Sequence, residues 1–148
     1  MADLRIERDV LIEAPVDVVW RTITEPDQIT RWFADRVELE LKPGGRGHLG
    51  FGEPGEHKGT AIVVETVDQP NRFAFRWKRP QDADPEPTNS VLVEFTLNAR
   101  GPERTHLRVV ESGLELVTWP DEEKQSYADD HNGGWAQCFD RLAMLFAR

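Results

Sequence analysis

The sequence predicts an α+β fold in which a curved antiparallel sheet of about six or seven strands wraps around one long C-terminal helix. Between residues 35 and 111, apolar residues recur at every second position in short runs divided by turn-forming residues, a pattern typical of an antiparallel meander with one buried face. After residue 120 the period changes to 3.6, which indicates an amphipathic helix over 121–147. A sheet with one apolar face and a helix with one apolar stripe must bury those surfaces against each other.

The first elements differ from this meander. Residues 4–12 alternate apolar and mostly charged side chains, which predicts a half-buried strand. Arg8 falls on the apolar side, where it either reaches out to water or lies inside a cavity. Pro15 then begins a short helix, since proline at the first helical position loses no hydrogen bond, and a second short helix begins at Pro26. This second helix is expected to carry three apolar residues, Ile29, Trp32 and Phe33.

Six strands are expected between the short helices and the long one. Turns are expected at 43–45, 52–55, 68–71 and 100–104, and a loop with three prolines at 80–88. The strand that follows Asn71 has an aromatic inner face, formed by Phe73, Phe75 and Trp77. Because the outer positions of these strands are charged, only one face of the sheet is expected to be buried.

Length and charge narrow the classes of function. A chain of 148 residues is expected to form a single domain over 1–148. A formal net charge of −9 with dispersed basic residues argues against nucleic acid and membrane surfaces as partners, because both require clustered Lys and Arg. The sequence has no apolar run of about 20 residues and no export signal, so a cytoplasmic protein is expected.

Motifs for metal binding and catalysis are missing from the sequence. There is no HExxH, CxxC, nucleophile elbow or glycine-rich phosphate loop, and the four histidines lack ligand spacing. The single cysteine, Cys138, lies on the apolar stripe of the long helix and is expected to be an inert core residue. We therefore expect no cofactor and no metal.

Four segments carry a resemblance to a known family. They are "EAPVDVVWRTITEPDQITRWF" (13–33), "KPGGRGHLGF" (42–51), "VVETVDQPNRFAFRW" (63–77) and "HNGGWAQCFDRLAMLF" (131–146). Their combination resembles homologues of the activator of heat-shock-protein-90 ATPase, in the START-like or SRPBCC superfamily. The resemblance implies the helix-grip fold, which Bet v allergen-like proteins share, with a cavity between sheet and helix. Lipid carriers, hormone receptors and polyketide cyclases of that superfamily use this cavity, so the resemblance alone does not select a function.

Inward-facing aromatic side chains form the main candidate binding site. Five tryptophans in 148 residues is a high number, and these rings either pack the core or line a ligand cavity. The candidate ligand-binding residues are Trp32, Phe33, Phe51, Phe75, Trp77, Phe95, Trp119, His131, Trp135 and Phe139.

Two polar residues are candidates for an acid, a base or a ligand contact. Glu111 shares the inward face of the last strand with Leu107 and Val109, where it is either desolvated inside the cavity or reaches solvent from the strand end. His131 lies one helical turn before Trp135, so it either points toward the cavity or makes a structural hydrogen bond.

The pair Gly133-Gly134 interrupts the apolar stripe of the long helix. Each glycine costs about 1 kcal/mol relative to alanine inside a helix. Three explanations are open. The helix approaches the sheet closely, the glycines leave space for a ligand, or the helix is broken in two at this point.

The leading hypothesis is a non-enzymatic protein that binds a hydrophobic or aromatic small molecule in the cavity. It predicts that small residues at Trp77 or Trp135 weaken ligand uptake more than stability. The alternative is an enzyme of the cyclase or dehydratase type, in which Glu111 and His131 move protons. A further alternative is a chaperone-linked or self-associating interaction module. A homodimer through an edge strand stays open as well, because an open sheet has edges.

Overall fold

A computed structural model describes residues 5–51, 58–77 and 90–147. The turn expected at 52–55 and the loop expected at 80–88 lie outside these residues. The elements follow in the order β1 (Ile6–Ile12), α1 (Val16–Thr24), α2 (Pro26–Ile29), β2 (Arg36–Leu39), β3 (Arg46–Phe51), β4 (Lys58–Asp68), β5 (Arg72–Trp77), β6 (Val91–Ala99), β7 (Thr105–Ser112), the 3-10 helix η1 (Leu114–Leu116) and α3 (Asp121–Leu145).

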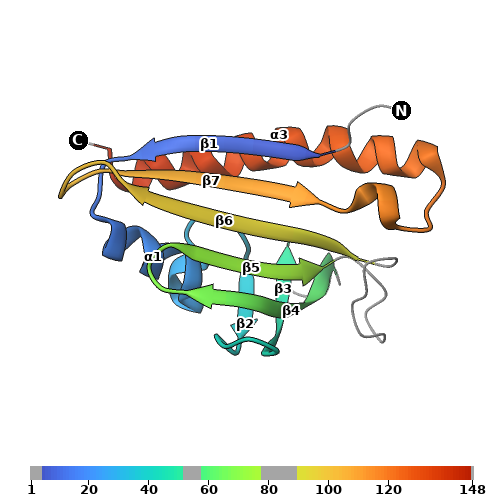
Figure 1. The fold of residues 1–148 in the computed structure, drawn as a ribbon, viewed down its shortest axis with the longest axis horizontal. Coiled ribbons are helices and arrows are strands. Elements are labelled where there is room, and N and C mark those ends of the chain that lie inside the picture. The colour runs from blue at the N-terminus through green and yellow to red at the C-terminus, as the bar shows by residue number, and fades with distance from the viewer. Residues whose placement is uncertain (1–4, 52–57, 78–89, 148) are drawn as a thin grey trace.

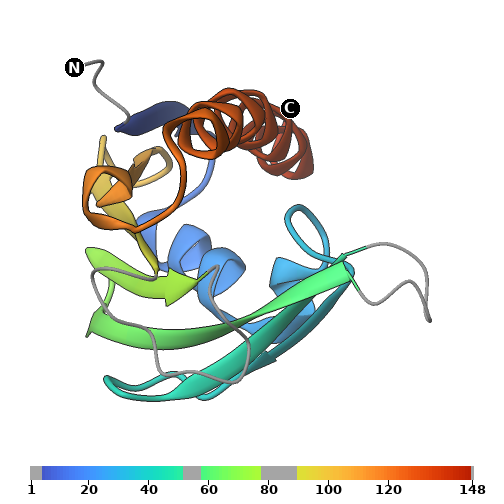
Figure 2. The ribbon, with the colours of Figure 1, turned by 90° about the vertical axis from the view of Figure 1, so that its right-hand side faces the viewer.

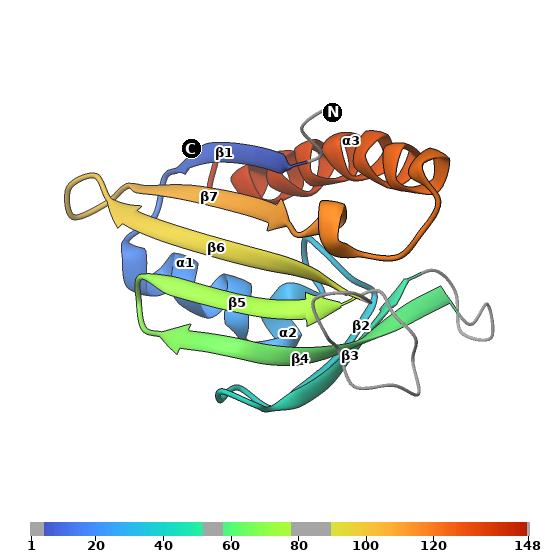
Figure 3. The same cartoon turned by 45° about the vertical axis from the view of Figure 1, so that its right-hand side comes forward.

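The strands form one antiparallel sheet with the order β1-β7-β6-β5-β4-β3-β2. Strands β2 to β7 make a meander, and β1 is added beside β7. The sheet is strongly curved, and its concave side holds α1 and α2 (Figure 2). The long helix α3 lies alongside β1 (Figures 1 and 3). This is the predicted helix-grip fold, and the prediction of the fold class is confirmed.

The two faces of the sheet differ in character, as the alternating sequence pattern predicts. In β6 and β7 every second side chain is buried, and these side chains meet α1 and α3 in the core. The other face carries ion pairs that join neighbouring strands: Arg72–Glu94, Arg76–Glu65 and Arg108–Glu7. The expectation of one buried and one charged face is therefore confirmed.

The second short helix is shorter than predicted. It ends at Ile29, and Trp32 and Phe33 lie in the turns that follow it. The N–H groups of Arg31 and Trp32 bond to carbonyls three residues back, at 3.0 and 3.3 Å, so the regular helix gives way to turns of the 3-10 type. The indole of Trp32 then donates to the carbonyl of Thr22 at 3.0 Å, which ties this segment to α1.

The side chain of Arg8 is exposed. It therefore reaches out to water, and the alternative in which it lies inside the cavity is wrong.

Among the described residues, none of the helices is both long and apolar enough to span a membrane.

Candidate functional site

Glu111 is a carboxylate inside the core. It lies near the end of β7, opposite Val93 of β6 and Ile6 of β1, and its strand parity directs it to the concave face. Its side chain is 0% exposed. The alternative in which Glu111 reaches solvent is therefore wrong.

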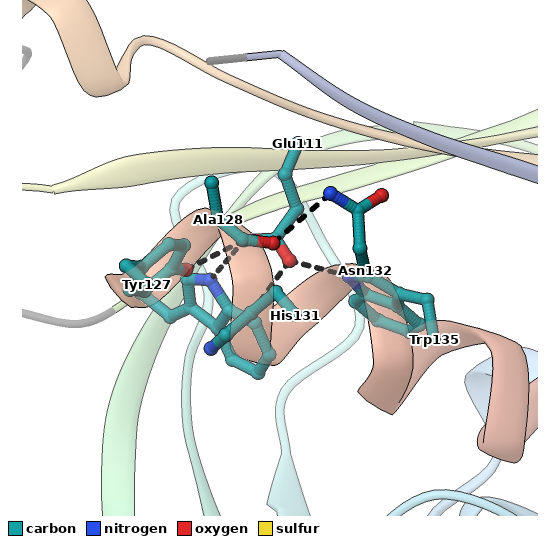
Figure 4. Close-up of polar contacts among 7 residues, drawn as sticks. Glu111, Tyr127, Ala128, His131, Asn132 and Trp135 are labelled. Atoms are coloured by element: carbon teal, nitrogen blue, oxygen red, sulfur yellow. Dashed lines mark hydrogen bonds and ion pairs between the residues drawn. The ribbon is translucent and has the colours of Figure 1, made fainter. Parts of the chain in front are cut away.

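Four donors surround the carboxylate of Glu111 (Figure 4). One oxygen, Oε1, accepts from Nδ1 of His131 at 2.7 Å and from the indole N–H of Trp135. The other, Oε2, accepts from the hydroxyl of Tyr127 at 2.5 Å and from the indole N–H of Trp77 at 3.3 Å. An ionised carboxylate has about four acceptor sites, so these donors satisfy Glu111 completely. We call these five residues the Glu111 cluster.

The long helix supplies three of the four donors because of their spacing. Tyr127, His131 and Trp135 are four residues apart, so they lie one above the other on the same face of α3. Trp77 comes from the end of β5. Tyr127 is the member that the sequence analysis missed, and its position one helical turn before His131 was the available signal.

His131 combines both roles that the sequence left open. Its Nδ1 is hydrogen-bonded to Glu111, and its ring stacks on Tyr127 with centroids 3.8 Å apart. Because an ionised carboxylate only accepts, Nδ1 of His131 carries a proton and donates it to this bond. Within the described part of the chain, Nε2 has no hydrogen-bond partner. The side chain is 19% exposed and forms part of a pocket wall.

This pocket lies along α3 and has a volume of about 340 Å³. We call it the α3 pocket. Its lining consists of Phe33, Trp77, Asp130, His131, Gly134, Trp135, Gln137, Cys138 and Arg141. Asp130, Gln137 and Arg141 are exposed and form the mouth, whereas Trp77 and Trp135 are buried and form the inner wall. The volume falls in the range of pockets that hold small molecules.

Aromatic rings make the inner wall nearly continuous. Phe33 stacks on Trp135, with centroids 5.0 Å apart and planes at 24°. Trp77 completes the wall, and its ring centroid lies 5.9 Å from that of Phe33 and 6.0 Å from that of Trp135. Four of the predicted ligand-binding residues, these three and His131, are therefore brought together at one pocket.

Other predicted ligand-binding residues pack among themselves. Trp32, Phe75 and Phe95 border a void of only about 10 Å³, which has room for no more than about one water molecule. Phe139 packs against Trp32 with centroids 6.4 Å apart, and it lines neither the void nor the α3 pocket. Aromatic and aliphatic side chains therefore fill this part of the expected cavity.

Two predicted residues lie elsewhere. Trp119 is half-buried and contacts Tyr127 with ring centroids 5.4 Å apart, so it touches the Glu111 cluster and not the α3 pocket. Phe51 ends β3, and its side chain falls outside the described part of the structure.

The glycine pair of α3 does not serve the packing of the helix. The helix runs without a break through Gly133 and Gly134, so the broken-helix explanation is wrong. A Cβ atom added at either position would meet nothing within 4 Å, so close approach to the sheet is wrong as well. Gly134 lines the α3 pocket, and the explanation by ligand space stays a prediction for it. Nothing in the structure explains Gly133.

Cys138 is not the core residue that the sequence predicted. It is partly exposed and lines the α3 pocket beside Arg141. Burial raises the pKa of the Cys138 thiol, and the nearby Arg141 guanidinium opposes part of this shift. The thiol is therefore less reactive than a free cysteine at neutral pH. Within the described ranges, no three His, Cys, Asp or Glu side chains are grouped to hold a metal ion.

Comparison with known families gives a match over most of the chain. The model of the family described as Activator of Hsp90 ATPase homolog 1-like protein matches residues 13–147. A comparison with curated proteins finds no match.

Solved structures share the fold. DynU16, a protein in the dynemicin biosynthetic locus, is 25% identical with a TM-score of 0.73, over 97% of this chain and 47% of DynU16. The Aha1 dimer from Colwellia psychrerythraea is 16% identical with a TM-score of 0.76, over 99% and 96% of the two chains. Protein MLL2253 from Mesorhizobium loti is 21% identical with a TM-score of 0.75, over 95% of each chain. This chain thus spans about half the length of DynU16.

Proposed function

We propose, from the premise that this chain belongs to the Activator of Hsp90 ATPase homolog 1-like protein family, that it binds a small hydrophobic or aromatic molecule in the α3 pocket. The observation that carries the proposal is the pocket of about 340 Å³ with stacked aromatic rings as its inner wall. Apolar walls with a few polar groups at the mouth are typical of small-molecule sites.

The Glu111 cluster supports the proposal by holding this wall in place. Trp77 and Trp135 each donate an indole N–H to the buried carboxylate, and this fixes the orientation of both rings without a ligand. A preformed wall lowers the entropy lost on binding. Gly134 leaves free space in the pocket, because a larger side chain at this position would project into it.

One solved structure gives a second line of support. DynU16 is a protein in the dynemicin biosynthetic locus. A binding role for this chain fits that setting. Because this chain spans about half of DynU16, the role of the longer protein is not carried over as a whole.

The test is native mass spectrometry of freshly purified protein, followed by solvent extraction of any bound molecule. We expect an adduct of a few hundred daltons in the wild-type protein. Gly134→Leu should remove the adduct because the new side chain enters the pocket, and Gly133→Leu, on the neighbouring exposed position, should keep it. An adduct that survives in Gly134→Leu at the wild-type level contradicts the assignment of the α3 pocket.

The glycine variants test the pocket better than variants of its tryptophans. The sequence predicts that small residues at Trp77 or Trp135 weaken ligand uptake more than stability. Both indoles are hydrogen-bonded to buried Glu111, so their removal also leaves this carboxylate short of donors and lowers stability.

The second candidate function is an enzyme of the cyclase or dehydratase type in the same pocket. The observation that favours it is the pair of His131 and Glu111, in which a buried carboxylate orients an imidazole whose Nε2 has no partner among the described residues. A histidine held in this way is suited to general acid–base chemistry. This reading predicts turnover of an extracted ligand with a bell-shaped pH–rate profile that is lost in Glu111→Gln and His131→Gln. Turnover that survives in both variants excludes these residues.

We also propose that residues 1–148 form a single domain that works in the cytoplasm and binds a hydrophobic small molecule as its partner.

A homodimer would use an edge of the sheet, and the two edges are β1 and β2. The charged outer face with its cross-strand ion pairs offers little apolar area for a chaperone-linked interaction. Analytical ultracentrifugation distinguishes a dimer, which β2 edge substitutions should dissociate, from a monomer.

A further inference from the structure

Arg141 is a cation at the mouth of the α3 pocket without a protein partner. Within the described part of the chain, its guanidinium makes neither an ion pair nor a hydrogen bond. The residues one turn away on α3 are uncharged: Gln137, Cys138, Met144 and Leu145. By contrast, arginines on the outer face of the sheet, such as Arg72 and Arg108, are paired with glutamates. The donors of Arg141 are therefore available to a ligand.

The α3 pocket has a positive and a negative end. Asp130 and Arg141 both line it and are eleven positions apart, or roughly 16 Å along the helix axis at about 1.5 Å per residue. The carboxylate of Glu111 lies at the same end as Asp130, behind His131. Between the two ends, Gly134 contributes no side chain and the aromatic wall is open to a ligand. An anionic group is repelled by the first end and attracted to the second.

We infer that the ligand of the α3 pocket is a planar aromatic molecule that carries a carboxylate, with its rings against Phe33 and Trp135 and its carboxylate on Arg141. This inference rests on the proposed binding function and adds the chemical class and the orientation of the ligand. The stacked rings of the wall accept a flat molecule face to face or edge to face. The planar guanidinium matches a carboxylate with two parallel N–H···O bonds.

The net negative charge of the protein makes the preference for an anionic ligand a specific test of Arg141. With a formal net charge of −9, the protein repels anions at long range. A preference for a carboxylate over its neutral amide therefore needs a local cation. The proximity of Arg141 to the pocket interior is also visible in its opposing effect on the pKa of Cys138.

Two probes of the same shape test the inference by isothermal titration calorimetry at low salt and pH 7. They are 2-naphthoate, which is ionised, and 2-naphthamide, which is neutral. We expect the wild-type protein to bind the naphthoate more tightly. Arg141→Gln should weaken naphthoate binding by about tenfold, the effect of one exposed charge-assisted contact, and should leave the amide unchanged, so that the order of the two probes inverts. The affinity of Arg141→Lys for naphthoate should lie between those of the wild type and of Arg141→Gln.

Arg100→Gln is the matched control, because Arg100 is an exposed arginine in the turn between β6 and β7. It should change neither affinity. If Arg141→Gln and Arg100→Gln weaken naphthoate equally, or if the amide binds as well as the naphthoate to the wild type, the carboxylate inference is wrong. In that case amide binding that is lost in Gly134→Leu keeps the proposed function. If neither probe binds in a way that depends on Gly134, the proposed function fails together with the inference.

Discussion

Glu111→Gln should destabilise the protein although the two side chains have the same shape. A carboxylate accepts at both oxygens, whereas an amide accepts at one atom and donates at the other. Each oxygen of Glu111 faces one indole N–H, from Trp135 on Oε1 and from Trp77 on Oε2. An indole N–H only donates, so either orientation of the amide sets one N–H against another.

The size of the effect follows from this conflict. One buried donor left without an acceptor costs about 1–3 kcal/mol, and the remaining bonds lose the extra strength of a charged acceptor. Removing a buried charge offsets part of the loss. We therefore expect a decrease of about 3 kcal/mol in the free energy of unfolding. With an m value of about 2 kcal/mol/M, the urea midpoint should fall by about 1.5 M.

Urea denaturation followed by tryptophan fluorescence measures this decrease. Glu94→Gln is the control, because Glu94 pairs with Arg72 on the outer face of the sheet, where a surface ion pair contributes about 0–1 kcal/mol. A midpoint for Glu111→Gln within the range of the control would refute the reasoning, since the four donors would then not depend on the charge of Glu111.

Three further predictions concern α3. Tyr127→Phe removes one of the four donors to Glu111 and should lower the free energy of unfolding by about 1.5–3 kcal/mol, measured by urea denaturation; no change would mean that water replaces the hydroxyl. Gly133→Ala and Gly134→Ala should each raise it by about 1 kcal/mol, or the melting temperature by about 2–4 °C, because the added Cβ meets no atom; a lower melting temperature in calorimetry contradicts this. Burial raises the pKa of Cys138, so its alkylation by iodoacetamide at pH 7 should be slower than that of a free cysteine. The rate should rise about tenfold per pH unit below the pKa of the thiol. A rate equal to that of the urea-unfolded chain contradicts this prediction.

The elements of the fold were predictable because each one follows a single period. Alternation over β7 and most of β6 depends only on which face is buried, and so does the spacing of Trp135, Phe139 and Leu142 in α3. The same parity placed Glu111 inward. The end of α2 was not predictable in this way, because it depends on the bond between Trp32 and the carbonyl of Thr22, a contact ten residues apart.

The candidate site was predictable only as a set of inward residues. Parity could not tell which aromatic rings fill space and which border it, because Phe95 and Trp135 are both inward and in edge-to-face contact. It also could not bring Trp77 and Tyr127 to the same carboxylate, since they belong to different elements. Cys138 sits at the border of the apolar stripe, where a small rotation of α3 decides between core and pocket.

The closure of the sheet by β1 has a consequence for the order of synthesis. β1 pairs with β7, about 100 residues later in the chain, so β1 has no partner from this sheet until β7 emerges from the ribosome. At about 5–20 residues per second, this delay lasts on the order of 5–20 s. During that time Ile6 and Ile12, both fully buried in the native sheet, are open to aggregation or to chaperones. Closing so large a loop also slows refolding, so the burial of β1 in the nascent chain depends on the arrival of β7.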